Sequence, residues 1–276
     1  MSDGKSIADH WATGDVYARI IDALGAAGID PETVTVEQLA PVDHFHARGF
    51  AATQELADSL PITAGQRIVD IGSGVGGPAR YLAQRFQCRV DGIDITRPFV
   101  DAANRLTELL GMTNGVTFVH GDGQELPFAD EMFDGACSQH VTMNVADRGA
   151  FFREAFRVLK PGGFFALTEH GLGEVGAPHH PLPWSEDGRG AFLMRPSETV
   201  AILERTGFGQ IEVTDTGEKY LQAYNRVMDM AARGETPVLG THILLGKLAP
   251  EIVRNAARNI VEKRTHPVQI LCRKPV

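Results

Sequence analysis

Short apolar stretches alternate along the chain with segments whose apolar residues recur every three or four positions. The short stretches have the length and composition of buried strands, and the segments between them have the period of amphipathic helices. We predict strands at residues 67–71, 89–96, 116–120 and 133–144, after the Pro-Gly-Gly turn at 161–163, and at 211–215 and 267–274. Strands that alternate with helices predict an α/β fold built on a parallel sheet.

The first predicted strand leads directly into a glycine-rich turn. Gly72, Gly74, Gly76 and Gly77 follow the strand, and Pro78 after them suits the first turn of a helix. Glycine lets the backbone approach a ligand closely. A strand, a glycine turn and a helix in this order are typical of a site for a nucleotide-like ligand.

Asp70, two residues before the first glycine, bears on which ligand this turn binds. The spacing of Gly72, Gly74 and Gly77 also satisfies the fingerprint of nicotinamide- and flavin-binding proteins. A carboxylate at Asp70 suits a cationic ammonium, such as the methionine end of S-adenosylmethionine, whereas it would repel a pyrophosphate. A glycine-rich turn that binds no ligand is the remaining alternative.

Acidic residues also mark the ends of the next two predicted strands. Asp94 lies where a carboxylate can accept hydrogen bonds from both hydroxyls of a ribose, which NAD and S-adenosylmethionine share. Asp122 can accept from an adenine amino group, while the backbone at Gly123 and Gln124 contacts the edge of the ring. The alternative for Asp122 is a structural one, in which it caps the next helix.

Five motifs in order give the chain a family resemblance. VDIGSGVGG, GIDIT, GDGQELPF, FDGACSQH and RVLKPGGFFAL together resemble the class I S-adenosylmethionine-dependent methyltransferases over roughly residues 65–170. The segments that flank them resemble the bacterial small-molecule branch that includes sarcosine and dimethylglycine N-methyltransferases. The resemblance implies S-adenosylmethionine as the cofactor and a small molecule as the methyl acceptor.

The resemblance also implies roles for particular residues. Asp70, Gly72 and Gly74 would lie at the methionine end of the cofactor, Asp94 at the ribose, and Asp122 with Gln124 at the adenine. Residues 138–140 would line the site of methyl transfer, and we place His46 and Arg48 in a cap over the cofactor. The predicted cofactor-binding residues are Asp70, Gly72, Ser73, Gly74, Gly76, Asp94, Ile95, Asp122, Gly123, Gln124, Ser138, His46 and Arg48.

We expect a Rossmann-like, doubly wound sheet of seven strands, the last of them antiparallel. Residues 1–60 are predicted to form an N-terminal helical cap and residues 61–215 the cofactor-binding core. Residues 216–266 are predicted to be a helical insertion between the sixth and seventh strands, and residues 267–276 the final strand. A hairpin would normally join these two strands, so we expect the insertion to form a lid over the strand ends.

The expected reaction is a direct displacement, in which the acceptor attacks the methyl carbon of the cofactor. His140 is the first candidate for a general base, because it follows the fourth strand and imidazole titrates near neutrality. His170, Glu169 and His46 are the next candidates, and for each of these four residues a purely structural role is the alternative. The aromatic residues that could face a cationic methylammonium group are Tyr17, Tyr220, Tyr224 and Trp184.

Composition narrows the function and the partners. The 276 residues carry a formal net charge of −9, and no cluster of Lys and Arg offers a phosphate-binding surface, so nucleic acid is an unlikely partner. The three cysteines have no metal-ligand spacing, so we expect reduced thiols and no metal site. We find no membrane-spanning pattern, and expect a cytoplasmic monomer or homodimer.

Together these features predict a methyltransferase that uses S-adenosylmethionine and acts on a small molecule, with an amine nitrogen as the first acceptor. Methyl transfer to oxygen or carbon is an alternative acceptor chemistry. Two other classes remain open, an NAD(P)-dependent oxidoreductase and a protein that binds the cofactor without catalysis.

Overall fold

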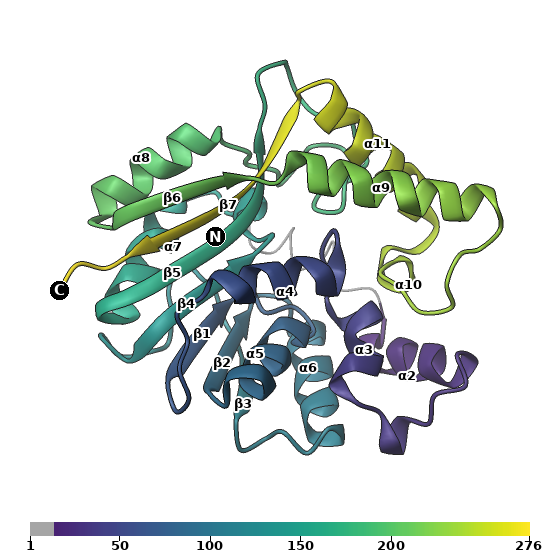
Figure 1. Ribbon diagram of the computed structural model, residues 1–276, viewed down its shortest axis with the longest axis horizontal. Coiled ribbons are helices and arrows are strands. Elements are labelled where there is room, and N and C mark those ends of the chain that lie inside the picture. The colour runs from purple at the N-terminus through teal and green to yellow at the C-terminus, as the bar shows by residue number, and fades with distance from the viewer. Residues whose placement is uncertain (1–13) are drawn as a thin grey trace.

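A seven-stranded sheet forms the centre of the molecule, for which the computed structural model describes residues 14–276 (Figure 1). The strands are β1 Arg67–Ile71, β2 Arg89–Asp94, β3 Val116–His120, β4 Phe133–Gln139, β5 Leu159–Leu172, β6 Gly209–Asp215 and β7 Thr265–Arg273. Their order is β3-β2-β1-β4-β5-β7-β6. The first five pair in parallel, and β7 runs antiparallel between β5 and β6. The predicted fold class is confirmed.

Helices cover both faces of the sheet. The helices α4 Gly49–Ser59, α5 Gly77–Phe86 and α6 Arg97–Leu109 bury one apolar face with strand residues such as Ile68 and Val90. The helices α7 Arg148–Val158 and α8 Pro196–Thr206 bury the other face, against Val69, Phe165 and Ile270. Because these helices cover both sides of the central strands, β1 and β4 are buried almost throughout.

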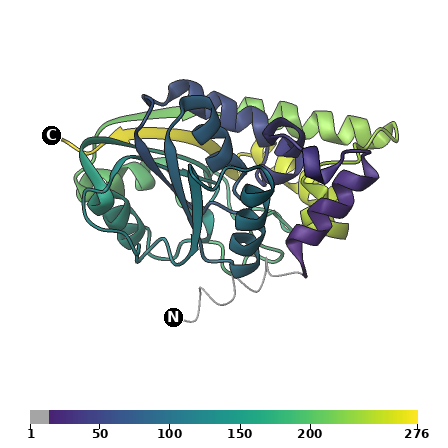
Figure 2. The ribbon, with the colours of Figure 1, turned by 90° about the horizontal axis from the view of Figure 1, so that it is seen from below.

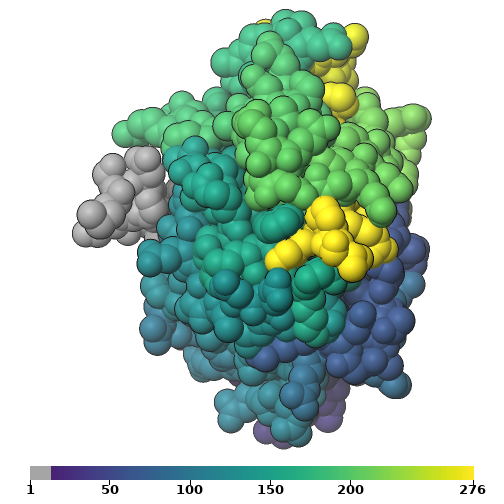
Figure 3. All heavy atoms as spheres, turned by 90° about the vertical axis from the view of Figure 1, so that its left-hand side faces the viewer, coloured from purple at the N-terminus to yellow at the C-terminus, as the bar shows by residue number. Residues whose placement is uncertain are grey.

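The remaining helices gather at one end of the sheet (Figure 2). They are α2 Val16–Ala26, η1 Pro31–Thr33 and α3 Val36–Asp43 before the core, and α9 Gly217–Ala232, α10 His242–Leu245, η3 Gly246–Leu248 and α11 Ala249–Val261 between β6 and β7. Helix α9 packs along α11, and α10 contacts α2. The opposite end of the molecule, where the C-terminus lies, is formed by segments of the sheet and of the helices that cover it (Figure 3).

One boundary that matters for the site differs from the sequence prediction. The strand β4 ends at Gln139 because His140 has a φ of 58°, and the 3-10 helix η2 Thr142–Asn144 follows. The turn after β4 therefore redirects the chain at His140. The helix α8 begins at Pro196, whose fixed φ suits a first helical position, and Arg195 is its N-cap residue.

Candidate active site

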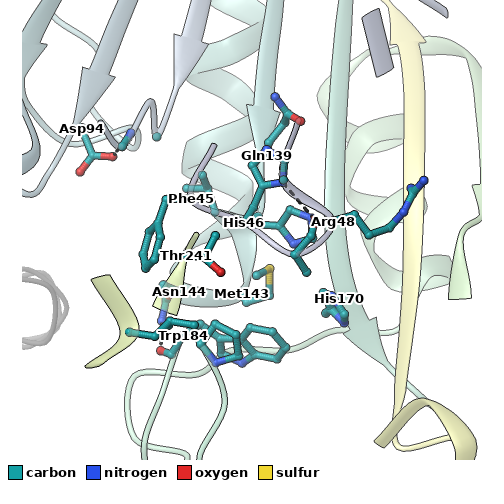
Figure 4. Close-up of a pocket in the computed structure, with 18 of the residues that line it drawn as sticks. Phe45, His46, Arg48, Asp94, Gln139, Met143, Asn144, His170, Trp184 and Thr241 are labelled. Atoms are coloured by element: carbon teal, nitrogen blue, oxygen red, sulfur yellow. Dashed lines mark hydrogen bonds between the residues drawn. The ribbon is translucent and has the colours of Figure 1, made fainter. Parts of the chain in front are cut away.

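A cavity of about 820 Å³ lies at the carboxyl ends of the central strands, under the helices α9 and α11 (Figure 4). Its wall combines residues from β1, β2, β4 and β5 with the segment 45–51 and with the helices α9, α10 and α11. The predicted site residues that line it are His46, Arg48, Gly72, Gly74, Asp94, Ile95, Asp122, Gly123, Gln124 and His140. Asp70, Ser73, Gly76 and Ser138 do not line it. Residues far apart in the sequence thus share one cavity.

The glycine turn after β1 is fixed by its backbone hydrogen bonds to the end of β2. The N–H groups of Gly72 and Ser73 donate to the carbonyl oxygen of Ile93, at 2.7 and 3.0 Å. Gly72 has a φ of 83°, and a Cβ there would lie 2.1 Å from Cγ2 of Val141. Only glycine fits this position, which therefore leaves open backbone at the cavity wall.

Asp94 holds the same turn from the end of β2. Its Oδ2 accepts a hydrogen bond from the Gly74 N–H and its Oδ1 accepts one from the Thr96 N–H, both at 2.8 Å. Each carboxylate oxygen has a second lone pair, so Asp94 can still accept hydrogen bonds from a ligand in the cavity. Burial raises the pKa of this carboxyl, and its hydrogen bonds oppose that shift.

Asp70 lies behind the turn, with 2% of its surface exposed. Its Oδ2 has no hydrogen-bond partner among the described residues. Burial, and then the nearby charge of Asp94, raise the pKa of Asp70 to about 7. Ser138 has a structural contact there, since its Oγ donates to the Ile71 carbonyl at 2.8 Å.

Asp122 shapes a turn at the end of β3. Its Oδ1 accepts from the backbone N–H of Gln124 at 2.8 Å, and the Gln124 side-chain carbonyl accepts from the Asp147 N–H at 3.2 Å. No helix begins at this turn, so the helix-cap alternative for Asp122 is wrong. Both side chains remain at the cavity wall.

Four rings lie in sequence along the wall of the cavity, each in contact with the next. His46 stacks on His140 with ring centroids 5.3 Å apart, His140 lies 5.3 Å from His170, and His170 lies 5.1 Å from Trp184. Figure 4 shows His46, His170 and Trp184 around the same space. The hydroxyl of Tyr220 lies 2.7 Å from Nε2 of His140. We call His46, His140, His170 and Trp184 the ring column.

Burial keeps the three imidazoles of the ring column neutral. It lowers the pKa of His46 to about 4 and that of His170 to about 3. The pKa of His140 is also well below its usual value, first through burial and then through its neighbours His170, His46 and Arg48. A neutral imidazole has a nitrogen lone pair that can accept a hydrogen bond, and the lowered pKa makes each of these rings a weaker base than a free imidazole.

Glu169, another candidate base, is fully engaged in a buried ion pair. Its Oε2 accepts from Arg148 at 2.7 Å and from Thr142 at 2.6 Å, and its Oε1 accepts from Thr199 at 2.8 Å. The side chains of Glu169 and Arg148 are both fully buried. This carboxylate ties β5 to α7 and α8 and is not offered to the cavity. Among the aromatic candidates, Tyr17 and Tyr220 also lie outside the cavity lining.

A second buried cluster of charged residues, which the sequence did not reveal, attaches α3 to the glycine turn. Arg80 donates to Oδ2 of Asp43 at 3.0 Å and to the Val75 carbonyl at 2.6 Å. A Cβ at Gly77 would lie 2.5 Å from the Asp43 carbonyl oxygen, so the two segments touch directly. Asp43 and Arg80 are far apart in the sequence, and no local pattern links them.

Helix α9 contributes lining residues of which only Tyr224 was a candidate from the sequence. Helix α9 presents to the cavity Lys219, Gln222, Ala223, Tyr224, Arg226, Val227 and Met230. Their spacing of three and four places them on one helix face. This spacing can be recognised in the sequence, because the segment was already predicted to be helical.

Two buried N–H donors at the cavity wall lack partners among residues 14–276. They are Nε2 of Gln139 and Nε1 of Trp184. Arg48 lies over the ring of Tyr220 at 5.3 Å, and it and Lys219 both pair with Glu55. This part of the cavity wall therefore offers hydrogen-bond donors and cations. The carboxylates that line the cavity, Asp94 and Asp122, lie at the strand ends.

The sequence over residues 69–167 matches the family described as the methyltransferase domain. This segment is a methyltransferase domain. The match spans β1 to β5 and so includes the glycine turn, Asp94, Asp122 and His140. The family resemblance expected from the five motifs is confirmed.

Relatives of the methyltransferase domain agree with this assignment. Methyltransferase phqN from Penicillium fellutanum is 33% identical over 170 residues, which make up 59% of this chain and 52% of that protein. The chain thus spans about half the length of that relative.

Two solved structures share the fold at low sequence identity. The geranyl diphosphate C-methyltransferase from Streptomyces coelicolor A3(2) has a TM-score of 0.75 at 19% identity, over 99% of this chain and 98% of that one. A Galdieria sulphuraria protein described as a sarcosine dimethylglycine methyltransferase has a TM-score of 0.67 at 18% identity, over 82% and 86%. These likenesses extend beyond the methyltransferase domain to the cap and lid segments.

Within residues 14–276, no group of His, Cys, Asp and Glu side chains is arranged to hold a metal ion. The helices of this part of the chain are also too short or too polar to cross a membrane.

Proposed function

We propose that this chain uses S-adenosylmethionine to methylate a small molecule held in the cavity under α9 and α11. The observation that carries the proposal is that two groups of residues line the same cavity. The glycine turn and Asp94 form one group, and the ring column with neutral His140 forms the other. A methyl donor and a methyl acceptor can therefore be held side by side.

The strand ends fit this cofactor in several respects. The open backbone at Gly72 and Gly74 can contact the methionine portion, and Asp94 has free lone pairs for the ribose hydroxyls. Asp122 and Gln124 face the cavity where the adenine would lie. Asp70 lies behind the turn and does not line the cavity, but its buried Oδ2, which has no hydrogen-bond partner among the described residues, would favour a cationic group nearby.

S-adenosylmethionine, when bound, supplies a methyl group on a cationic sulfur, which departs as a thioether when the acceptor's lone pair attacks. The protein has to align the two molecules and exclude water, and alignment alone can contribute roughly 7–11 kcal/mol to lowering the barrier. His140 accepts the proton that an amine or hydroxyl acceptor must lose. Tyr220 holds its ring through the 2.7 Å contact at Nε2.

An amine nitrogen remains our first candidate for the methylated atom. Tyr220, Tyr224 and Trp184 gather around His170, and the two of them that line the cavity, Tyr224 and Trp184, offer aromatic faces of the kind that attract alkylammonium groups. The Galdieria protein, described as a sarcosine dimethylglycine methyltransferase, supports the same chemistry by analogy.

One observation favours a hydroxyl oxygen as a second candidate. The lining carboxylates lie at the strand ends, while Arg48, Lys219 and Arg226 line the acceptor side. An ammonium group there would meet these cations, two of which pair with Glu55, and no carboxylate that lines the cavity, whereas a hydroxyl carries no charge. Neutral His140 could accept its hydrogen bond and then its proton.

The test has two stages, and calorimetry with S-adenosylhomocysteine comes first. Binding is expected, and the absence of heat would refute the proposal, whereas stabilisation by NADH instead would favour an oxidoreductase. In the second stage the protein is incubated with S-adenosylmethionine and a metabolite extract, and mass spectrometry detects a product heavier by one methylene unit. Fragmentation of that product identifies the methylated atom.

His140→Ala tests the proposed base. Methyl transfer should slow by about 10²- to 10⁴-fold while S-adenosylhomocysteine binds as in the wild type. His179→Ala is the matched control, because His179 pairs with Glu262 on α11 and does not line the cavity. Wild-type turnover in His140→Ala would remove this residue from the mechanism.

A further inference from the structure

A second cavity of about 420 Å³ adjoins the candidate active site. It lies between α2, the helices α10 and α11, and the segment that carries Leu182. Figure 1 shows α10 between α2 and the pair α9 and α11. Phe99, Pro183, Leu245 and Ile252 line both cavities. The two spaces therefore meet along a shared apolar wall.

The second cavity is lined mainly by apolar side chains. Those that line it beyond the shared wall are Val16, Leu182, Leu244 and Leu248. Its polar members are Arg19 and Glu186. Arg19 donates a hydrogen bond to the Ile243 carbonyl, so part of its guanidinium is engaged within the lid. A ligand in this space would gain mostly from burying hydrocarbon.

The size of the two spaces bears on the acceptor. A cavity of about 820 Å³ is within the range that usually holds one ligand, and here it must hold a cofactor and an acceptor. A two-carbon amine would need none of the second cavity. A long acceptor would extend past Phe99 and Leu245 into it.

We infer that the methyl acceptor is an elongated molecule with a hydrocarbon tail, and that this tail occupies the second cavity. The inference rests on the proposed function, since it concerns the acceptor of the same site. It adds a tail-binding subsite formed by α2, α10, η3 and the residues 182–186. The competing occupant is the chain's own segment 1–13, which precedes Val16 in the sequence.

The test uses alkanols and alkylamines with butyl, octyl and dodecyl chains as probes, titrated by calorimetry with S-adenosylhomocysteine at saturation. Each methylene buried in the second cavity should lower Kd by about fourfold until the space is filled. A Kd that does not fall with chain length would overturn the inference. Failure of S-adenosylhomocysteine to bind would instead refute the proposed function.

Two variants fill the second cavity from different sides. Leu248→Trp and Glu186→Trp introduce an indole at residues that line this cavity and not the main one. Both should lose the gain in affinity with chain length and keep the wild-type affinity for butyl probes. Val261→Trp is the control, because Val261 is 66% exposed on α11 and lines neither cavity. Retention of the gain in both cavity variants would overturn the inference.

Deletion of residues 1–13 tests the competing occupant. If the acceptor tail fills the second cavity, the dependence of Kd on chain length should be the same with and without this segment. A dependence that appears only after the deletion would assign the space to the chain's own N-terminal residues and overturn the inference.

Discussion

Replacing Asp94 by alanine should weaken cofactor binding more than it weakens the fold. The carboxylate accepts hydrogen bonds from the Gly74 and Thr96 N–H groups and keeps free lone pairs toward the cavity. A hydrogen bond to a charged acceptor contributes about 1.5–3 kcal/mol. Loss of one such bond to a ribose hydroxyl would raise Kd by roughly 10- to 150-fold. Loss of both would raise it further.

The assay is calorimetric titration of Asp94→Ala with S-adenosylhomocysteine, combined with a denaturant unfolding curve of the same protein. The curve is needed because the variant also loses two backbone hydrogen bonds in the glycine turn. The backbone N–H groups lie at a partly buried site, where water can replace part of the lost interaction. We therefore expect a folded variant with reduced affinity.

Asp91→Ala is the matched control on the same strand. Asp91 pairs with Arg67 at 2.6 Å and accepts from Thr117 at 2.9 Å, and it does not line the cavity. Its replacement should lower stability slightly and leave the affinity for S-adenosylhomocysteine unchanged. A folded Asp94→Ala protein that binds this ligand as tightly as the wild type would refute the assigned role of Asp94.

Three further predictions follow from the same geometry. Gly72→Ala should lower stability and cofactor affinity more than Gly111→Ala does. Both glycines have a positive φ, but only a Cβ at Gly72 meets another side chain, at 2.1 Å from Val141. Equal melting temperatures for the two variants would contradict this prediction. Glu169→Gln should lower the free energy of unfolding by about 3–5 kcal/mol, because it leaves the buried Arg148 charge without its partner, whereas Glu55→Gln, at a 39% exposed carboxylate, should cost less than about 1 kcal/mol in denaturant titrations. Asp70 should make stability fall as pH rises from about 4 to about 7, because its raised pKa lets the folded protein keep a proton that the unfolded chain releases. The melting temperature of Asp70→Asn relative to that of the wild type should therefore rise across this pH range. A difference in melting temperature that stays constant with pH would refute this prediction.

Residues that act through their place in a short segment could be identified from the sequence. The apolar runs predicted the strands, and the glycines after β1 predicted the turn, because both depend on the conformations of neighbouring residues. Asp94 and Asp122 could be placed at strand ends for the same reason. The carboxyl ends of parallel strands meet at one edge of a sheet, so these residues were expected to share a site.

The sequence was less informative wherever a side chain's role depends on a distant partner. Glu169 was a candidate base by position, and its pairing with Arg148 shows it to be structural. Asp43 and Arg80 attach α3 to the glycine turn, and neither carries a local signal for this contact. The end of β4 was placed too late, because the turn at His140 is fixed by tertiary contacts that strand periodicity does not encode.

The sequence by itself determined the α/β class, the methyltransferase motifs and the strand-end carboxylates, since strand, turn and helix preferences are properties of adjacent residues. Only the tertiary structure decided that His46, His140, His170 and Trp184 form one column and that a second cavity adjoins the first. Those arrangements depend on how the cap and lid helices pack over the sheet. Packing between distant segments sets the neutral state of the histidines and the space left for an acceptor.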